Sequence, residues 1–329
     1  MFYYLLGIPR HHKLFTRSDK MVLWGSCFSE ELRKHLYEEL YDVEGSPYGI
    51  MYNPMSIARG LRQVINNSSP KSQDLFFYQG EWHSLMHHSD FSRADKEGAL
   101  QGMLEAFEKS RTALKECSLL VVTFGTAYIY EELEHRQVVN NCHKLPTQEY
   151  FSQRRLTINE IVDEWKKLIS DLKQYNPQME VLFSVSPIAH YRDGAHENRL
   201  SKAILHLAID TLCRESDGLF YFPAYEILQD ELRDYRFYSS DFAHPSEEAV
   251  RYILHRFSSA YLDIDAENSF SREWHSVLSF IRHIPMTTNK SDILQHYQQS
   301  IEKLQIFSHK ISHPFLDEQL ELLKRKLSE

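Results

Sequence analysis

The chain has few cysteines, and their spacing is not that of a metal or disulfide framework. Its 329 residues include Cys27, Cys117, Cys142 and Cys213, which lie far apart and form no C-x-x-C motif. This pattern argues against a zinc cage built on paired cysteines and against a small disulfide-stapled fold. We therefore expect free thiols in a reducing compartment, the cytoplasm, and we expect no metal and no other cofactor.

Long apolar runs are absent as well. No stretch approaches the roughly 20 uninterrupted apolar residues that a bilayer-spanning helix needs. Residues 1–10 begin with apolar side chains, but His11-His12-Lys13 follows instead of the small-residue cleavage site of a signal peptide. We expect a soluble protein that does not act at a membrane.

The chain also has fewer basic than acidic residues. Lysine and arginine number 37 against 46 aspartates and glutamates, so the formal net charge is −9. An acidic chain is repelled by polyanions, which argues against nucleic acid as a partner. The hydrophobic content of 42% and the aromatic content of 13% are those of a globular protein that can bury one large core or two smaller ones.

The sequence is organised around a turn at Gly25. The apolar run Met21-Val22-Leu23-Trp24 ends there, and a helical pattern follows with leucines at every fourth position, Leu32, Leu36 and Leu40. We expect a strand, a tight turn and a helix that Ser29 caps, with acidic residues in its first turn. Cys27 then lies just before the helix N-terminus, where backbone N–H groups and the helix dipole favour a thiolate and an oxyanion beside it. This is a suitable position for a nucleophile.

Apolar strands alternate with amphipathic helices along the chain. Further strands are predicted within 41–53 and at 119–124, 181–185 and 219–222, and further helices at 56–65, 95–117, 157–175, 198–216 and 246–261. This alternation implies right-handed crossovers and a parallel sheet that is covered on both faces. We therefore predict an α/β fold, a three-layer α/β/α sandwich with a central parallel sheet of about five strands in flavodoxin-like order.

Two internal segments and the C-terminal part fall outside this alternation. Residues 74–91 and 128–139 have the pattern of hairpin insertions, in which short strands flank turn residues. After the last core helix the pattern is helical, with a break at Thr287-Thr288-Asn289. We predict one domain over residues 1–262 and a helical appendage over 263–329 that packs on it, with a homodimer through these helices as the alternative.

Polar residues follow the predicted strands at the points where they end: Ser26 and Cys27, then Gly49, Thr126, and Ser186 with His190. The carboxyl ends of parallel strands meet at one edge of the sheet, so we expect these residues to lie close together. The motif Asp241-x-x-His244-Pro245 precedes the last core helix, and a loop there can reach the same edge. A nucleophile, a base within hydrogen-bond reach and a group that orients the base are what acyl transfer requires.

The segment Gly25-Ser26-Cys27-Phe28 resembles the signature of the GSCFA family, a group of SGNH/GDSL-type hydrolase relatives. The similarity continues in the expected order and covers roughly residues 20–262. Its further segments are 46–54, 123–126, 141–144, 184–187, 198–202, 230–238 and 241–245. Agreement over so many segments makes the resemblance specific, which the four-residue signature alone would not be.

The resemblance implies an acyl-ester hydrolase with defined roles for particular residues. His244 would be the base and Asp241 the residue that orients it, as in SGNH-type enzymes. Cys27 stands where related hydrolases carry their serine, and Ser26 is the alternative nucleophile. The substrate we expect is a small-molecule or carbohydrate ester, with an O-acetyl or short-chain acyl group. An acyltransferase with the same nucleophile and a noncatalytic carbohydrate-binding or scaffold module are the alternatives.

The sequence departs from the SGNH pattern at the oxyanion hole, where Ala127 occupies the place of an asparagine. The backbone N–H groups of Cys27 and Gly49 remain as donors, together with the Thr126 hydroxyl. The other residues that we expect to bind the oxyanion or line the cleft are Ser26, Asn141, His143, His190 and Asn198.

Histidines in the first predicted hairpin have a spacing that suggests a metal site. His83 and His87 are four residues apart, as in H-E-x-x-H, but Ser84 stands in place of the glutamate. We therefore expect polar lining of the cleft and no zinc at these histidines. Lys202, one helical turn after Asn198, has a position that fits a solvated charge as well as a residue of the cleft.

Overall fold

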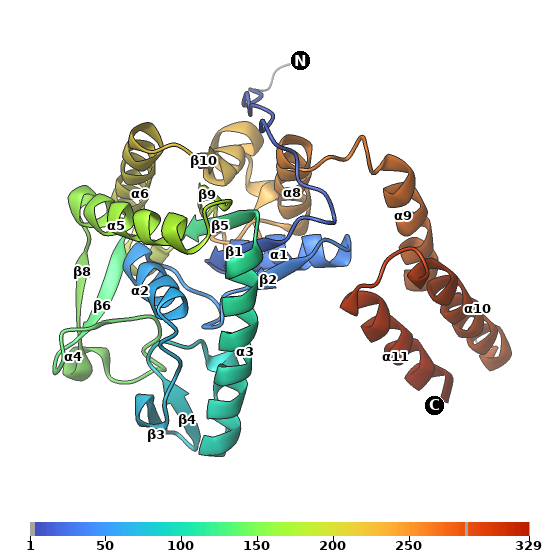
Figure 1. The fold of residues 1–329 in the computed structure, drawn as a ribbon, viewed down its shortest axis with the longest axis horizontal. Helices are drawn as coiled ribbons and strands as arrows, with labels where there is room; N and C mark the ends of the chain where they lie inside the picture. Colours follow the sequence, from blue (N-terminus) through green and yellow to red (C-terminus); the bar gives the residue numbers. More distant parts are fainter. Residues whose placement is uncertain (1–3, 287–288, 329) are drawn as a thin grey trace.

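A computed structural model describes residues 4–286 and 289–328 of the chain. A five-stranded parallel sheet lies at its centre, in the order β10-β9-β5-β1-β2 (Figure 1). The strands are β1 (Met21–Gly25), β2 (Val43–Gly45), β5 (Leu119–Phe124), β9 (Glu180–Val185) and β10 (Leu219–Phe222). Numbered among themselves along the chain, these strands follow the flavodoxin-like order 2-1-3-4-5. The predicted α/β class, the parallel pairing and the strand order are confirmed.

Helices cover both faces of the sheet, because side chains along each strand alternate between two apolar clusters. In β1, Val22 and Trp24 belong to one cluster, and Met21 and Leu23 belong to the other. The first face is covered by α2 (Pro54–Ile65), α3 (Lys96–Glu116), α5 (Ile158–Tyr175) and α6 (Ala195–Glu215). The second face is covered by α1 (Cys27–Glu38) and α8 (Glu247–Tyr261). The result is the three-layer sandwich that the alternation of elements predicts.

Both predicted hairpins are present, and the second is larger than predicted. β3 (Leu75–Tyr78) pairs antiparallel with β4 (Glu81–Ser84). β6 (Tyr128–Glu132) pairs with β7 (Val138–Val139) and also with β8 (Phe151–Arg155), which follows α4 (Thr147–Tyr150). The prediction from sequence missed β8 because its last four residues, Ser-Gln-Arg-Arg, are polar and show no apolar alternation.

Short helical turns occupy several of the connections. The chain between β10 and α8 contains α7 (Ala224–Glu226) and a π-helical turn at Ile227–Leu232. Turns of 3-10 helix lie at Ser72–Asp74, Ser89–Phe91, Tyr191–Asp193 and Tyr235–Phe237.

Two helix starts illustrate what the sequence does and does not encode about capping. The Thr157 hydroxyl accepts from the Glu160 N–H in a capping box at the start of α5, at the residue where the helix was predicted to begin. At α1 the prediction was wrong, because the N-cap residue is Ser26 and not Ser29. Ser29 lies inside the first turn, where its N–H donates to the Ser26 carbonyl at 2.8 Å. The helix therefore begins at Cys27, and the thiol belongs to its first turn.

The C-terminal part contains α9 (Asn268–Arg282), α10 (Lys290–Ser308) and α11 (Pro314–Ser328), which lie to one side of the sheet in Figure 1. Residues of these helices, among them Trp274 and Phe315, form an apolar cluster with Leu40 after the end of α1. The Trp274 indole also donates to the Glu38 carbonyl at 2.8 Å. The domain boundary after residue 262 stays a prediction, and the predicted break at 287–289 falls mostly outside the described residues.

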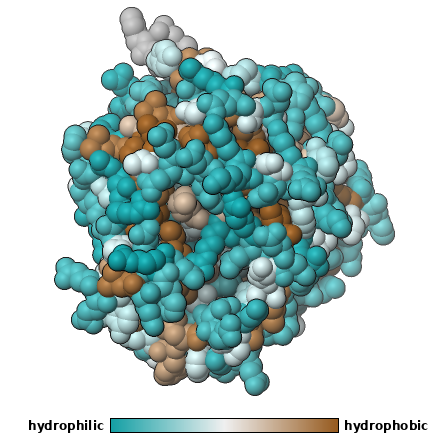
Figure 2. Space-filling view, turned by 60° about the vertical axis from the view of Figure 1, so that its left-hand side comes forward, coloured by the Kyte–Doolittle hydropathy of each residue, from teal (hydrophilic) through white to brown (hydrophobic). Residues whose placement is uncertain are grey.

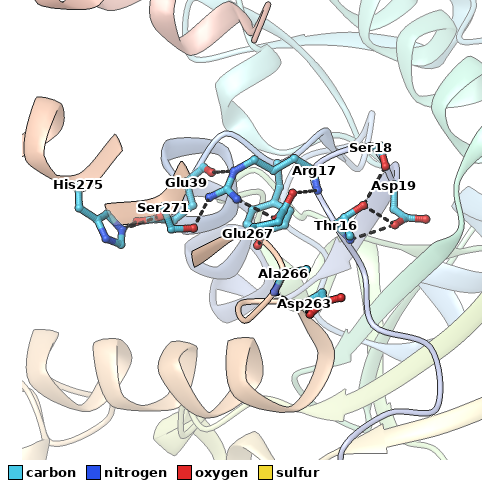
Figure 3. A network of polar contacts seen from close by, with 11 residues as sticks. Thr16, Arg17, Ser18, Asp19, Glu39, Asp263, Ala266, Glu267, Ser271 and His275 are labelled. Atoms are coloured by element: carbon cyan, nitrogen blue, oxygen red, sulfur yellow. Dashed lines mark hydrogen bonds and ion pairs between the residues drawn. The ribbon is translucent and has the colours of Figure 1, made fainter. Parts of the chain in front are cut away.

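A buried arginine joins the end of α1 to the start of α9 (Figure 3). Arg17 Nε donates to the Glu39 carbonyl at 2.9 Å, Nη1 pairs with Glu267 at 2.8 Å, and Nη2 donates to the Ser271 hydroxyl at 3.2 Å. The guanidinium also lies over the Tyr41 ring, 4.7 Å from its centroid. Because a guanidinium presents several donors in a rigid plane, this one side chain fixes the two helices relative to each other.

The surface is mostly hydrophilic on the face drawn in Figure 2, where apolar residues occur only in small separate patches. Such a distribution is ordinary for a surface in contact with water. Among the described helices, none combines the length and the hydropathy that a bilayer span requires.

The packing of β1 against β5 predicts that replacing Gly25 strongly lowers the stability of the protein. A Cβ atom at Gly25, where φ is +138°, would lie 2.2 Å from the Thr123 carbonyl oxygen. Gly25→Ala must therefore strain or separate the two strands, and we expect it to lower the free energy of unfolding by on the order of 3 kcal/mol. Urea denaturation followed by circular dichroism measures this change.

Gly102→Ala is the matched control. Gly102 lies within α3 with no atom within 4 Å of its added Cβ, so alanine there should stabilise the helix by about 0.5–1 kcal/mol. A Gly25→Ala protein as stable as the wild type would contradict the packing described for β1.

Candidate active site

The turn after β1 gives two neighbouring side chains different surroundings. Ser26 has extended backbone angles, with φ −67° and ψ 175°, and its N–H donates to the Thr123 carbonyl at 3.2 Å. The Ser26 hydroxyl is buried and has no hydrogen-bond partner among the described residues. Cys27, the first residue of α1, is only half-buried. The turn therefore directs Ser26 into the protein and presents Cys27 at the carboxyl edge of the sheet.

Cys27 and His244 line the same pocket, which has a volume of about 740 Å³. Apolar side chains form part of its lining, from Phe28 and Leu254 among others. Charged side chains from α1, α8 and α9 complete it: Glu31, Lys34, Glu38, Glu247, Arg251 and Arg282. The pocket thus combines an apolar part beside the thiol with a polar part that suits a hydroxyl-rich or charged ligand.

His244 is held by Asp241 on the loop before α8. Its Nδ1 donates to Asp241 Oδ2 at 2.6 Å, while Asp241 Oδ1 accepts from the backbone N–H groups of His244 at 3.0 Å and Ala243 at 2.9 Å. These backbone hydrogen bonds, with the one from the His244 ring, lower the pKa of Asp241 to about 2. The carboxylate is therefore ionised near neutral pH, and it fixes the proton of the neutral imidazole on Nδ1 and the lone pair on Nε2.

Backbone hydrogen bonds fix this loop against the rest of the sheet edge. The Ser239 N–H donates to the His244 carbonyl at 2.8 Å, and the Ser239 hydroxyl donates to the Pro245 carbonyl at 3.1 Å. The Ala189 N–H, in the segment after β9, donates to the Ala243 carbonyl at 3.0 Å. The His244 side chain is half-exposed, but its backbone is held from both sides.

Tyr52 contacts the thiol and was not among the predicted site residues. Its hydroxyl lies 3.4 Å from Cys27 Sγ. Burial, together with the neighbouring Cys27, raises the pKa of the Tyr52 phenol, so the group stays protonated and can donate to the sulfur. The Tyr52 carbonyl accepts from Gly125 N at 2.7 Å and from Thr126 N at 3.0 Å, which ties this residue to the end of β5. The one sequence signal was its position in the 46–54 segment of the family resemblance.

His190 and Asn198 lie behind Tyr52. The His190 ring packs edge-on against the Tyr52 ring with centroids 5.5 Å apart, and the His190 N–H donates to Asn198 Oδ1 at 2.9 Å. Burial, with smaller contributions from the neighbouring Lys202 and His244, lowers the pKa of His190 to about 4. His190 is thus a neutral histidine of the site, one layer removed from the thiol.

Two of the predicted oxyanion donors are engaged in other hydrogen bonds. The Gly49 N–H donates to the Ser46 carbonyl at 3.2 Å in a turn where Gly49 has φ +73°, so this N–H is not free to hold an oxyanion in the structure. The Thr126 hydroxyl bonds to the Ser201 hydroxyl at 3.1 Å and accepts from the Tyr128 N–H at 3.1 Å. Both groups therefore already have partners within the protein.

The start of α1 offers donors that are free. In the described part of the chain, the backbone N–H groups of Cys27 and Phe28 donate to no protein acceptor. Both belong to the first helical turn, whose N–H groups have no carbonyl partner within the helix. These are the groups that can hold a negative oxygen beside Cys27.

Asn141 and His143 lie beside β4, in a cluster of their own. Asn141 Oδ1 accepts from the His143 N–H at 2.8 Å, and His143 Nε2 donates to the Ser84 carbonyl at 2.7 Å. The His143 ring also packs on that of His83, with centroids 4.5 Å apart. The structure therefore does not bring these two predicted residues into the pocket that Cys27 lines.

Lys202 is not a solvated charge, which was one of the two interpretations that its sequence position allows. The side chain is buried, and its Nζ donates to the Gly125 carbonyl at 2.7 Å and the Ser186 carbonyl at 2.8 Å. These carbonyls follow β5 and β9, so one ammonium joins the ends of two neighbouring strands. Burial lowers the pKa of Lys202 to about 7.

The fold and the site define an α/β protein in which a cysteine and a hydrogen-bonded histidine–aspartate pair line one pocket at the carboxyl edge of a parallel sheet. The chain belongs to the GSCFA family, whose family model matches residues 20–257. Among solved structures, a Clostridium thermocellum family 3 carbohydrate esterase is similar with a TM-score of 0.35 and 8% sequence identity, over 77% of this chain and 100% of that chain. A comparison with curated proteins found no match.

The burial of Lys202 predicts how the stability of the protein changes with pH. An unfolded lysine has a pKa of about 10.4, so between pH 7 and 10 the unfolded chain binds a proton that the folded chain has released. The stability of the wild type should therefore rise with pH over this range. We expect the difference in free energy of unfolding between the wild type and Lys202→Met to shift in favour of the wild type by on the order of 1 kcal/mol per pH unit between pH 7 and 9. Denaturation series at several pH values measure the difference.

Lys115→Met serves as the control, because Lys115 is exposed on α3. Its pH profile should run parallel to that of the wild type. Parallel profiles for the wild type and Lys202→Met would instead show that Lys202 keeps its proton in the folded protein.

Proposed function

We propose that this protein is an acyl-ester hydrolase in which Cys27 is the nucleophile, His244 the general base and Asp241 the residue that orients the base. The observation that carries the proposal is the shared pocket, lined by Cys27 and by a His244 ring whose Nδ1 is fixed on Asp241. Asp241 leaves His244 Nε2 as the nitrogen that can accept a proton. The burial of the Ser26 hydroxyl supports Cys27 over Ser26 as the attacking group.

The proposed reaction has two stages. His244 Nε2 takes the proton of the Cys27 thiol, and the sulfur attacks the ester carbonyl carbon. The negative oxygen of the tetrahedral intermediate binds the N–H groups of Cys27 and Phe28 at the start of α1. His244 then gives its proton to the departing alcohol, which leaves an acyl group on Cys27 as a thioester. In the second stage His244 takes a proton from water, and the hydroxide attacks the thioester carbon. The carbon–sulfur bond then breaks, the acid leaves, and His244 returns its proton to the Cys27 sulfur.

Tyr52 has a positioning role in this proposal. Its hydroxyl contacts Cys27 Sγ, and its backbone is fixed to the end of β5. Because the phenol stays protonated, it can donate a hydrogen bond to the sulfur and stabilise the thiolate. The sulfur is thereby held at the edge of the pocket.

The pocket supports a small acyl group on a polar alcohol as the substrate class. The apolar side chains of Phe28, Ile188 and Leu254 suit a short acyl chain. The charged residues around them suit an alcohol with several hydroxyl groups, as in an O-acetylated carbohydrate. The half-exposed His244 ring leaves room for water as the acceptor.

The first test identifies the attacking atom. Mass spectrometry after incubation with an activated acetyl ester should find one acetyl group on Cys27, removable by neutral hydroxylamine because it is a thioester. Cys27→Ala should abolish this adduct, and Ser26→Ala should leave it in place. An adduct that survives Cys27→Ala and disappears in Ser26→Ala would assign the attack to Ser26 and overturn the proposal.

The second test concerns the base. His244→Ala should lower kcat for an aryl acetate by about 10²–10⁴-fold, the usual contribution of a general base, while the thermal midpoint stays near that of the wild type. Asp241→Asn should lower kcat by a similar or smaller factor. His255→Ala is the matched control, because His255 is an exposed histidine on α8. Full activity in His244→Ala would exclude His244 as the base.

A further inference from the structure

Two consecutive histidines near the N-terminus meet a glutamate at the opposite edge of the sheet from Cys27. Glu180 is the first residue of β9, so it lies at the amino ends of the strands. The backbone N–H of His11 donates to the Ala260 carbonyl at 2.9 Å, which holds the N-terminal segment against the end of α8. The ligand atoms of His11, His12 and Glu180 all lie within 4.8 Å of one another.

The hydrogen bonds of His11 define which ring nitrogen is free. Nδ1 lies 2.6 Å from the Lys13 carbonyl oxygen and 3.3 Å from the Lys13 backbone nitrogen. A carbonyl can only accept, so the shorter contact requires the proton on Nδ1, and the Lys13 N–H then has no acceptor there. In the neutral ring Nε2 carries a lone pair, and this buried atom has no hydrogen-bond partner among the described residues.

The atom that faces this lone pair is also an acceptor. His11 Nε2 lies 3.7 Å from Glu180 Oε2, a buried oxygen that likewise has no hydrogen-bond partner in the described part of the chain. The other oxygen, Oε1, lies 3.0 Å from His12 Nε2. Two buried acceptors that face each other are unfavourable unless a positive centre lies between them.

A proton fits this gap poorly and a metal ion fits it well. An N–H···O hydrogen bond needs a separation of about 2.7–3.2 Å, which is shorter than the distance between His11 Nε2 and Glu180 Oε2. With Zn–N and Zn–O bonds of about 2.0–2.2 Å, tetrahedral angles place the ligand atoms about 3.3–3.6 Å apart. His11 Nε2 and Glu180 Oε2 are 3.7 Å apart, slightly more than this range, and His12 Nε2 and Glu180 Oε1 are 3.0 Å apart, slightly less.

We propose that His11, His12 and Glu180 bind a divalent transition-metal ion of the zinc class. Two imidazoles and one carboxylate are a donor set that zinc uses, and the Lys13 carbonyl on His11 Nδ1 is the outer partner that orients such a ligand. The His12 side chain is 63% exposed, which gives the ion a path from solvent and leaves a coordination position for water. The His11 side chain is only 3% exposed and packs edge-on against the Phe220 ring.

The site would fasten the N-terminal segment to the sheet. His11 and His12 belong to that segment, while Glu180 belongs to β9, so one ion joins parts of the chain that are distant in sequence. It lies at the amino ends of the strands, whereas Cys27 follows the carboxyl end of β1. The expected effect is therefore on stability and not on acyl transfer. This site also differs from the sequence expectation of no metal, which considered His83 and His87 but not these histidines.

The test begins with the whole 329-residue chain freed of metal by a chelator. Isothermal titration calorimetry then measures Zn²⁺ binding, and thermal unfolding with and without Zn²⁺ measures its effect on stability. We expect one Zn²⁺ per chain and a rise in Tm on Zn²⁺ addition. His12→Ala removes an exposed side chain and should leave the fold intact, yet weaken Zn²⁺ binding at least tenfold and abolish the rise in Tm. Glu180→Gln should weaken binding to a similar extent, because it removes the negative charge.

A second group of His and Glu side chains gives a matched control. Glu132, Glu134 and His135 also lie close together, but on an exposed part of the surface. His135→Ala should bind Zn²⁺ like the wild type, and His12→Ala should turn over an aryl acetate at the wild-type rate. The proposal is overturned if the wild type binds no Zn²⁺ in a one-to-one ratio, or if His12→Ala binds Zn²⁺ as tightly as the wild type.

Discussion

The close contact between β1 and β5 at Gly25 is the constraint on which the candidate site depends. Because Gly25 has no side chain, its backbone passes directly against the Thr123 carbonyl, and the Ser26 N–H bonds to the same carbonyl. The chain then turns at once into α1, so that Cys27 is the first helical residue. A larger residue in this turn would push α1 away from the sheet and move the thiol with it. The position of the thiol thus follows from strand pairing.

Most of the fold could be predicted because its strands and helices have simple local patterns. β5 and β9 are covered on both faces, which requires continuous apolar runs, and the covering helices repeat apolar residues with the helical period. β8 has no such pattern, because it pairs with β6 on the surface and carries polar side chains. The start of α1 was misplaced because two nearby serines can both cap a helix, and the choice depends on where β1 ends.

The candidate site could be predicted only in part. Strand ends and a motif before the last core helix led to Cys27, His244 and Asp241, whose roles stay predictions. Local spacing does not give the direction of a loop after its strand, so Gly49, Asn141 and His143 were expected in a pocket that they do not line. Lys202 has the sequence setting of an exposed helical residue. Its burial follows from carbonyl partners that lie 77 and 16 residues away along the chain.

One of the C-terminal helices, α9, reaches the pocket that Cys27 and His244 line. Arg282, the last residue of α9, lines that pocket and pairs with Glu38, the last residue of α1, at 2.8 Å. The helix α1 therefore carries the thiol at its N-terminal end. Its C-terminal end is fixed by the Arg282–Glu38 ion pair and by the hydrogen bond from Arg17 to the Glu39 carbonyl. The position of α9 therefore determines how far the pocket extends along α1. A chain with the same sheet and a different C-terminal segment would keep the reacting groups and accept ligands of a different length.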